Sequence, residues 1–290
     1  MKPLVNSYFS GCGGLDLGLL QAGLQVQQSL EIDRACAKVL GKNFDHAVLQ
    51  CDITTRTVLE QKRAHVIAGT YPCTKYSPIA DIHGTRTGDD LFLHFFRHIA
   101  IMQPDVYVVE NVPGMKKFPV VMEAMKQLPN YYVTEFCPVD AIQWLPQKRA
   151  RLIIIGTKEP FRINPPSCRR RMSIRSVLEK SPNYTLPQYF RNRFTGKYRD
   201  NPIIVDPGEP GAFAPTCVAH YSKDKSTRVV KDDRSPIGVR PFTPREYARL
   251  QGFPDDFELP NNGSAYRMVG NAVPVPMGRW IGQELMRYFN

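Results

Sequence analysis

The first half of the chain alternates short apolar runs with longer amphipathic stretches. Runs with the length and composition of β-strands lie at 3–9, 26–32, 46–50, 65–69, 105–110, 131–136 and 151–157. Apolar residues with helical spacing lie between them at 15–23, 34–44, 89–102 and 119–128. Strands that alternate with helices of this length predict an α/β fold built on a doubly wound, mainly parallel sheet. The last two runs have no helical stretch between them, so we expect an antiparallel edge there.

The pattern changes after Thr157. Residues 158–239 are rich in Pro, Arg and Tyr and follow no clear period, which is typical of a small second domain or of a set of binding loops. Helical spacing returns at 243–253 and again at 273–289. We therefore predict a first domain at 1–157, a second region at 158–239 with a variable core at 158–213, and a return to the first domain at 240–290.

Positive charge is concentrated in the second region. The 290 residues carry a net charge of +11, and 158–199 hold eleven Lys and Arg against Glu159 and Glu179, which leaves +9 in this segment. Aromatic residues are interleaved with these cations at Tyr184, Tyr189, Phe190, Phe194 and Tyr198. Basic side chains neutralise phosphates and aromatic rings stack on bases, so the segment favours contact with nucleic acid. A solvated basic surface is the alternative.

Several classes of protein do not fit the composition. No apolar run approaches the ~20 residues that span a bilayer, and the N-terminus lacks the apolar stretch of a secretory signal. The seven cysteines are scattered, and no pair has the spacing C-x-x-C, which argues against a zinc site or a disulfide framework. We expect no metal, no membrane partner, and reduced thiols in the cytoplasm or nucleus.

The motif YFSGCGGLDLG, at 8–18, places glycines where a strand ends and a helix begins. Such a turn lets the backbone approach a ligand, and the helix N-terminus points N–H groups toward it. Glu31 ends the next strand, where a carboxylate can accept both hydroxyls of a ribose, and Asp52 follows the third and could bind an adenine amino group. The chain has no G-x-x-x-x-G-K, so an adenosine-containing ligand that does not need a loop to cradle several phosphates fits better than ATP. An ordinary strand-end acid is the alternative for each carboxylate.

Candidate catalytic groups follow the next strands. Cys73 comes directly after a proline, whose ring stiffens the turn behind the fourth strand. Glu110 ends the fifth strand and can lie beside Cys73, and a thiolate with a carboxylic acid suits attack on an electron-poor ring. The segment QKRAR opens another strand, and its alternation would place Gln147, Arg149 and Arg151 on one face. Taken singly, a buried thiol and a surface glutamate remain the alternatives.

Six short motifs, in order, resemble those of the C5-cytosine DNA methyltransferases. That family carries F-x-G-x-G-G, P-C, E-N-V, Q-x-R-x-R, R-E-x-x-R-L-x-G-F-P and G-N-x-V, and this chain has FSGCGG, PC, ENV, QKRAR, REYARLQGFP and GNAV. The match covers nearly the whole chain apart from the variable core. The resemblance implies a class I, Rossmann-like methyltransferase fold, with 1–157 as the catalytic and cofactor domain and 158–239 as the target-recognition region.

The resemblance also implies S-adenosylmethionine as cofactor and S-adenosylhomocysteine as product. Glu31 would take the ribose hydroxyls, and Ile32 would pack on the adenine. The edge of the adenine would be read by Asp52 and Ile53. From the far end of the chain, Asn271 and Val273 would close the pocket, and the C-terminal helix after them would dock beside the first helix. The remaining residues expected at the cofactor are Phe9, Gly11, Gly13, Gly14, Leu15, Pro72 and Leu91.

The same resemblance assigns the chemistry. Cys73 would add to C6 of a cytosine that is flipped out of the duplex, and this addition would activate C5 for methylation. Glu110 would hold N3 and N4 of the base. Arg151 would hold its O2, and Arg149 would brace Glu110.

The loop that carries Cys73 departs from the commonest family pattern, G-G/F-P-P-C-Q-G/A-F-S. Thr70 stands where a glycine is usual, Thr74 replaces a glutamine and Lys75 replaces a small residue. Because the residues before the proline line the base pocket, Thr70 could narrow that pocket or add a hydroxyl to it.

Double-stranded DNA is the partner that the resemblance implies. The expected DNA contacts are Arg169, Arg170, Arg171, Arg191, Arg193 and Thr216. The first three would serve phosphates, and Arg191 and Arg193 would read bases. Thr216 lies in APTCVAHY, which resembles a family strand that faces the DNA. We expect a monomer that is encoded by a prokaryote or a phage and acts in the cytoplasm, with a cognate restriction endonuclease as a further candidate partner.

Two other functions compete with DNA methylation. One is a tRNA cytosine methyltransferase on the same fold, whose Cys-Phe-Thr signature is missing here because arginines follow Cys168. The other is a catalytically silent, DNA-binding member of the family. Intact Cys73, Glu110, Arg149 and Arg151 argue against that second alternative.

Overall fold

The computed structural model describes residues 2–58, 62–72, 91–167, 172–197, 200 and 202–290. The chain divides into two compact units. The first comprises Met1–Asp140, Ala150–Pro166 and Val275–Asn290, and the second comprises Ala141–Arg149 and Ser167–Pro274. Residues 240–274, which we expected in the first domain, thus belong to the second compact unit. The functional boundaries drawn from the sequence stay predictions.

The first unit is built on a seven-stranded sheet with the order β3-β2-β1-β4-β5-β7-β6. The strands are β1 (Leu4–Tyr8), β2 (Gln25–Glu31), β3 (Ala47–Gln50), β4 (Val66–Gly69), β5 (Val106–Asn111), β6 (Tyr132–Asp140) and β7 (Ala150–Thr157). Strands β1 to β5 are parallel, and β7 runs antiparallel to both of its neighbours. The predicted fold class and its antiparallel edge are confirmed. The strand order reverses at β1, which is where sheets of this kind bind ligands.

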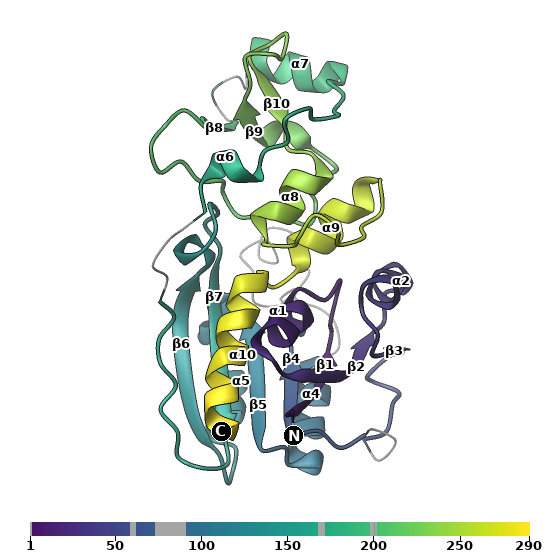
Figure 1. The fold of residues 1–290 in the computed structure, drawn as a ribbon, viewed down its shortest axis with the longest axis vertical. Coiled ribbons are helices and arrows are strands. Elements are labelled where there is room, and N and C mark those ends of the chain that lie inside the picture. The colour runs from purple at the N-terminus through teal and green to yellow at the C-terminus, as the bar shows by residue number, and fades with distance from the viewer. Residues whose placement is uncertain (1, 59–61, 73–90, 168–171, 198–199, 201) are drawn as a thin grey trace. The chain divides into compact units, whose positions relative to one another are not determined.

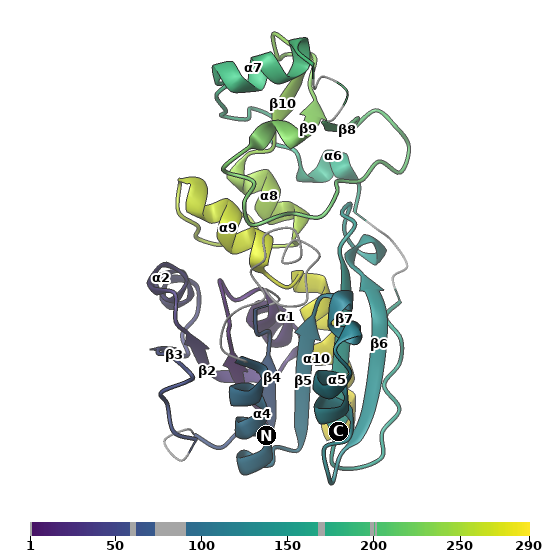
Figure 2. The same ribbon diagram turned by 180° about the vertical axis from the view of Figure 1, so that it is seen from behind.

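Helices cover both faces of this sheet. Figures 1 and 2 show α1 and α10 on one face and α4 and α5 on the other. The described helices of this unit are α1 (Gly14–Ala22), α2 (Arg34–Asn43), α4 (Leu91–Met102), α5 (Pro119–Lys126) and α10 (Val275–Phe289), with a 3-10 turn η1 (Pro113–Lys117). Each of these α-helices coincides with a stretch of helical spacing in the sequence, within a few residues at each end.

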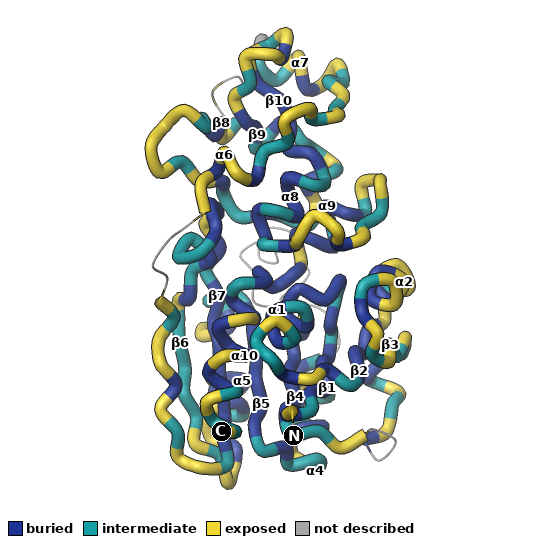
Figure 3. The backbone as a smooth tube through the Cα atoms, in the orientation of Figure 1, coloured by how far each residue is buried: buried dark blue, intermediate teal, exposed yellow. Residues whose placement is uncertain are grey.

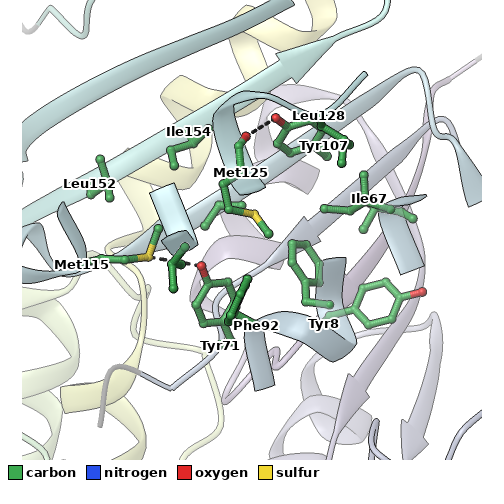
Figure 4. Packing of buried hydrophobic residues seen from close by; sticks show 14 of the residues in the cluster. Tyr8, Ile67, Tyr71, Phe92, Tyr107, Met115, Met125, Leu128, Leu152 and Ile154 are labelled. Atoms are coloured by element: carbon green, nitrogen blue, oxygen red, sulfur yellow. Dashed lines mark hydrogen bonds between the residues drawn. The ribbon is translucent and has the colours of Figure 1, made fainter. Parts of the chain in front are cut away.

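The central strands are apolar on both faces, and this is why the sheet is buried. Every residue of β5 is buried, and the dark tube in Figure 3 follows β4, β5 and β7. Figure 4 shows the core beside them, where the Tyr107 hydroxyl donates to the Met125 carbonyl and the Tyr71 hydroxyl lies 3.2 Å from the Met115 sulfur. Continuous apolar runs are typical of parallel strands that helices cover on both sides.

Helix α10 returns from the far end of the chain to pack against α1. Gly18 lies at the point of contact, where an added Cβ would be 2.5 Å from the Val275 carbonyl oxygen, so a larger residue does not fit. Further along, an added Cβ at Gly282 would lie 2.5 Å from that of Ala22. The predicted docking of the C-terminal helix beside the first helix is confirmed.

The second unit contains a three-stranded sheet with the order β10-β9-β8. Its elements are η2 (Ala141–Gln143), α6 (Ile174–Val177), α7 (Gln188–Thr195), β8 (Ile203–Val205), η3 (Lys225–Thr227), β9 (Arg228–Lys231), β10 (Val239–Pro241), α8 (Pro244–Leu250) and α9 (Gly263–Asn271). Phe190 of α7 packs with Val229 and Val239 of the sheet. Among these elements we expected only α8, because no clear period marks the others in the sequence.

A buried ion pair ties β10 to α8 within this unit. The Arg240 guanidinium donates to both carboxylate oxygens of Glu246, at 2.7 and 2.8 Å, and to Asp232 at 2.7 Å. Glu246 also closes a capping box with Thr243 at the start of α8. Beside this pair, the ring of Tyr221 stacks on that of Tyr247 with 4.9 Å between their centroids.

Neither a membrane span nor a metal site occurs in the part of the chain that the structure describes. The longest described helix, α10, has 15 residues, and none of the described helices is long and apolar enough to cross a bilayer. Nor do three or more described His, Cys, Asp or Glu side chains gather where they could hold a metal ion.

Candidate active site

Four parallel strands of the first unit end at one edge of the sheet. Tyr8, the last residue of β1, pairs with Leu30 of β2 and with Gly69 at the end of β4. Gly69 pairs in turn with Val109 of β5. The segments that follow these strands therefore share the edge where α/β sheets bind ligands. They are the turn at 9–14, Glu31 with Ile32, the segment 70–72, and Glu110 with Asn111.

The turn between β1 and α1 has a left-handed backbone. Phe9 has a φ of 58°, and Gly13, which caps α1, has a φ of 86°. A side chain at Gly13 would also lie 2.4 Å from the ring of Phe44, so this position requires glycine. The space beside Gly11 is open, because an added Cβ there would have no atom within 4 Å. The turn thus leaves room for a ligand next to the N-terminus of α1.

Glu31 ties the end of β2 to this turn. Its carboxylate accepts the N–H groups of Gly11, at 2.7 Å, and of Asp33, at 2.8 Å. Burial raises the pKa of Glu31 above its ordinary value, although both N–H groups favour the charged form. Ile32 is 61% exposed directly beside it. Glu31, which is expected at the ribose, and Ile32, which is expected at the adenine, thus place a polar and an apolar group side by side.

The other residues of the first unit that we expected at the cofactor differ in their exposure to solvent. Asp52 accepts the N–H and the hydroxyl of Thr54, both at 2.8 Å, and these bonds lower the pKa of Asp52. Leu15 and Ile53 are buried, Leu91 packs half-buried against the main core, and Pro72 is exposed. Asn271 and Val273 belong to the second unit, and their place at the cofactor stays a prediction.

A buried polar network joins α1 to β1 and β2, and our reading of the sequence missed it. Asp16, in the first turn of α1, accepts the hydroxyls of Ser7 and Ser29. The Ser29 hydroxyl also lies 2.7 Å from Nε2 of His46. Burial raises the pKa of Asp16 and lowers that of His46. A single aspartate within the apolar run LDLGLL was the signal that could have indicated this network.

Glu110 and Arg151 form an ion pair at the sheet edge. Nε of Arg151 lies 2.8 Å from Oε1 of Glu110, and both side chains are largely buried. Next to Glu110, the Asn111 amide donates to the Tyr71 carbonyl at 3.1 Å, and so holds the segment that leads to Cys73. Cys73 itself lies outside the described residues, as do Thr74 and Lys75. The structure thus brings together two of the four predicted catalytic side chains.

Arg149 has a different environment from Arg151. Strand β7 begins at Ala150, so the predicted alternation of 147, 149 and 151 on one strand face is wrong. The buried Arg149 guanidinium instead donates to three carbonyl groups of the second unit, at 2.9 Å each: those of Cys217, Gly270 and Ala272. These bonds are those of a structural tie within the second unit, which differs from the expected brace on Glu110.

The expected DNA contacts lie in the second unit. Arg169, Arg170 and Arg171 are outside the described residues. Arg191 and Arg193 lie on α7, and Nη2 of Arg193 forms an ion pair with Asp224 at 2.6 Å. The Thr216 hydroxyl donates to the Lys148 carbonyl at 2.8 Å. The segment 214–221 around Thr216 is not the predicted strand, and contains an isolated bridge from Ala214 to Gln147 instead.

The order of the motifs and the geometry of the sheet edge agree with one family of known proteins. The model of the C-5 cytosine-specific DNA methylases matches residues 5–287. The chain belongs to this family. The resemblance drawn from the six motifs is thus confirmed, and the protein is a methyltransferase.

Relatives of this methyltransferase cover nearly its whole length. The Type II methyltransferase M.Sau96I of Staphylococcus aureus is 28% identical over 326 residues, which cover 97% of this chain and 75% of that protein. The Type II methyltransferase M.MthTI of Methanothermobacter thermautotrophicus is 26% identical over 329 residues, which cover 99% and 98%. Among solved structures, the Entamoeba histolytica methyltransferase EhMeth has a TM-score of 0.83 at 19% identity, with 100% and 99% covered, and so shares the fold.

Proposed function

We propose that this methyltransferase transfers a methyl group from S-adenosylmethionine to C5 of a cytosine in double-stranded DNA. The observation that carries the proposal is the buried pair of Glu110 and Arg151 at the sheet edge, beside the segment that leads to Cys73. The match to the model of the C-5 cytosine-specific DNA methylases supports DNA as the substrate. A cognate restriction endonuclease and a monomeric state are further proposals, which genetic neighbourhood and sedimentation would test.

The residues around the glycine-rich turn fit the adenosine end of the cofactor. An ionised carboxylate can accept about four hydrogen bonds. The Glu31 carboxylate accepts two of them from the N–H groups of Gly11 and Asp33, which orient it. Its remaining acceptor positions can take hydrogen bonds from the two ribose hydroxyls. The exposed Ile32 side chain offers an apolar face for the adenine ring, and the open space beside Gly11 leaves room for the remainder of the cofactor. When bound, S-adenosylmethionine supplies an electrophilic methyl group.

The protein's own groups must make C5 of the cytosine nucleophilic. The Cys73 thiolate adds to C6, which converts the ring to an enamine with electron density at C5. Glu110 holds N3 and N4 and gives N3 the proton that relieves its developing charge. Arg151 orients that carboxylate and holds O2 of the base. After C5 has taken the methyl group, a base removes the C5 proton and the Cys73 thiolate leaves C6. The target cytosine is flipped out of the duplex for these steps.

A trapped covalent complex tests this proposal. Duplex DNA with 5-fluorocytosine at the target should form an adduct with the protein, because fluorine at C5 cannot leave as a cation in the elimination step. Cys73→Ser should abolish the adduct, while Cys36→Ser and Cys217→Ser should not, since both of these thiols are buried. Burial also raises the pKa of Cys217 to about 12, so that thiol stays protonated near neutral pH. An adduct mapped to another cysteine would refute the mechanism.

The nucleic acid is tested separately with labelled cofactor. Methyl groups should appear in duplex DNA and not in tRNA, and bisulfite sequencing would then give the target sequence. Incorporation into tRNA alone would replace DNA as the substrate while leaving the roles of Cys73 and Glu110 intact.

A further inference from the structure

Thr70 occupies a position where a glycine is usual in this family, and its side chain has a defined partner. The Thr70 hydroxyl donates to the carbonyl oxygen of Phe9 at 2.8 Å. Glycine cannot make this bond. Thr70 was expected to narrow the base pocket or to add a hydroxyl to it, and the structure turns that hydroxyl to the turn at 9–14 instead.

Phe9 is the residue of that turn which most needs support. Its φ of 58° lies in the left-handed region, which is unfavourable for a residue other than glycine. Such a conformation persists only where the surrounding structure over-determines it. On the side of β2, the Leu30 carbonyl accepts the N–H of Ser10 at 3.2 Å, and Glu31 accepts the N–H of Gly11. On the side of β4, the Thr70 hydroxyl holds the Phe9 carbonyl.

Thr70 is itself held firmly enough to serve as this support. Its N–H donates to the Tyr8 carbonyl at 3.2 Å, which continues the pairing of β4 with β1. The next residue, Tyr71, is buried, and its ring meets that of Phe9 edge to face with 6.3 Å between centroids. Asn111 holds the Tyr71 carbonyl from β5. Thr70 and Tyr71 thus connect the turn at 9–14 to β4, which precedes Cys73, and to β5, which carries Glu110.

We infer that the Thr70 hydroxyl is a positioning group for the cofactor, because it presets the left-handed conformation of Phe9 before the cofactor binds. This inference rests on the proposed function, since it takes the turn at 9–14 as the cofactor site. A preset turn need not be ordered at the moment of binding, so the hydroxyl strengthens affinity without touching the ligand. Here the chain obtains from a side chain a support that a glycine at this position cannot supply.

Binding of S-adenosylhomocysteine to the full chain, measured by calorimetry, tests the inference. Thr70→Val removes the hydroxyl at nearly constant shape and should weaken binding about 3- to 10-fold, the loss that corresponds to one neutral hydrogen bond. Thr70→Ser keeps the hydroxyl and should bind within about twofold of the wild type. Thr70→Gly restores the usual family residue without the hydroxyl and should match Thr70→Val or bind more weakly. Affinity for duplex DNA without cofactor should be the same in all of them.

Thr157→Val is the matched control. The Thr157 hydroxyl also donates to a main-chain carbonyl at 2.8 Å, that of Glu159, but Thr157 pairs with Val106 at the opposite end of the sheet. Its loss should leave cofactor affinity unchanged. Wild-type affinity in both Thr70→Val and Thr70→Gly, or equal losses in Thr70→Ser and Thr70→Val, would overturn this inference alone. A wild-type protein that binds no S-adenosylhomocysteine would overturn the proposed function and this inference with it.

Discussion

Both units of this methyltransferase bury apolar residues, and the second also contains an ion pair with almost no exposure to solvent. In the first, apolar burial is repeated along the central strands, and β5 is buried throughout. In the second, a buried ion pair and stacked tyrosines lie among short elements, with Arg240 and Glu246 1% and 0% exposed at their side chains. Apolar burial distributes its contribution to the free energy of unfolding over many residues. In a buried ion pair, removing one residue leaves the other charge buried and unpaired, so a single substitution is costly.

The residues expected at the cofactor and the base and those expected to read DNA also lie on different kinds of element. The sheet edge presents groups held by main-chain contacts from several strands, such as Glu31 and the Thr70 hydroxyl. The second unit presents its basic residues on a short helix and on connecting segments. A site that must keep a fixed geometry for chemistry benefits from the rigid sheet edge, and residues that read varied DNA sequences can be exchanged more freely on short elements.

The largest expected effect breaks the buried ion pair of the second unit. Arg240→Ala should cost about 3–5 kcal/mol in the free energy of unfolding, because it leaves Glu246 charged and buried without its partner. Arg249→Ala is the control, since its partner Asp255 is 65% exposed, and it should cost at most about 1 kcal/mol. Scanning calorimetry would show both, and equal losses would contradict the special cost of breaking a buried pair.

The next effect tests the apolar core of the first unit. Ile154 is fully buried in β7, so Ile154→Ala should cost about 2–5 kcal/mol and Ile154→Val only about 0.5–1.5 kcal/mol. The loss should thus grade with the volume removed, as expected for packing. Denaturant unfolding measures it, and a Val variant as unstable as the Ala variant would argue against this account.

A smaller effect concerns ligand binding at the sheet edge. Glu31→Ala should weaken S-adenosylmethionine binding by about 1.5–3 kcal/mol, the range of a hydrogen bond to a charged group. Glu123→Ala, which removes an exposed carboxylate from α5, should leave the affinity unchanged. Calorimetric titration of both variants separates a local role from a general effect of charge. Unchanged affinity in Glu31→Ala would remove Glu31 from the site.

The smallest expected effect is the pH dependence of cofactor affinity. Burial raises the pKa of Glu31, so its carboxylate takes up a proton at a higher pH than an ordinary glutamate, whose pKa is about 4.3. Affinity should be full above the raised pKa and fall as the pH drops through it, because a protonated carboxyl accepts hydroxyls less well. The Asp33 charge, which faces Glu31, adds to the shift.

Glu31→Gln separates this titration from that of the nearby Asp16 and His46. The variant should bind more weakly and lose the acidic limb of the profile. Titrations at several pH values would show this, and an acidic limb that survives in Glu31→Gln would assign it to the Asp16 network instead.

The amino-acid sequence was sufficient to predict the sheet of the first unit, its helices and the family. Strands and helices of the first unit are long or apolar enough to leave a period, and their alternation implies a parallel sheet. Parallel strands end at one edge, so residues such as Glu31 and Glu110 could be placed at a common site from their positions alone. The motifs then identified the family because their order along the chain is specific.

The neighbours of these residues could not be predicted, because they depend on how the elements pack. Arg149 and Arg151 look equivalent in QKRAR, yet β7 starts between them, and one holds carbonyl groups of the second unit while the other meets Glu110. The Thr70 hydroxyl could have faced a base, and its bond to Phe9 depends on β4 lying beside β1. Contacts between residues far apart in sequence leave no period in it, because they depend on the packing of complete elements.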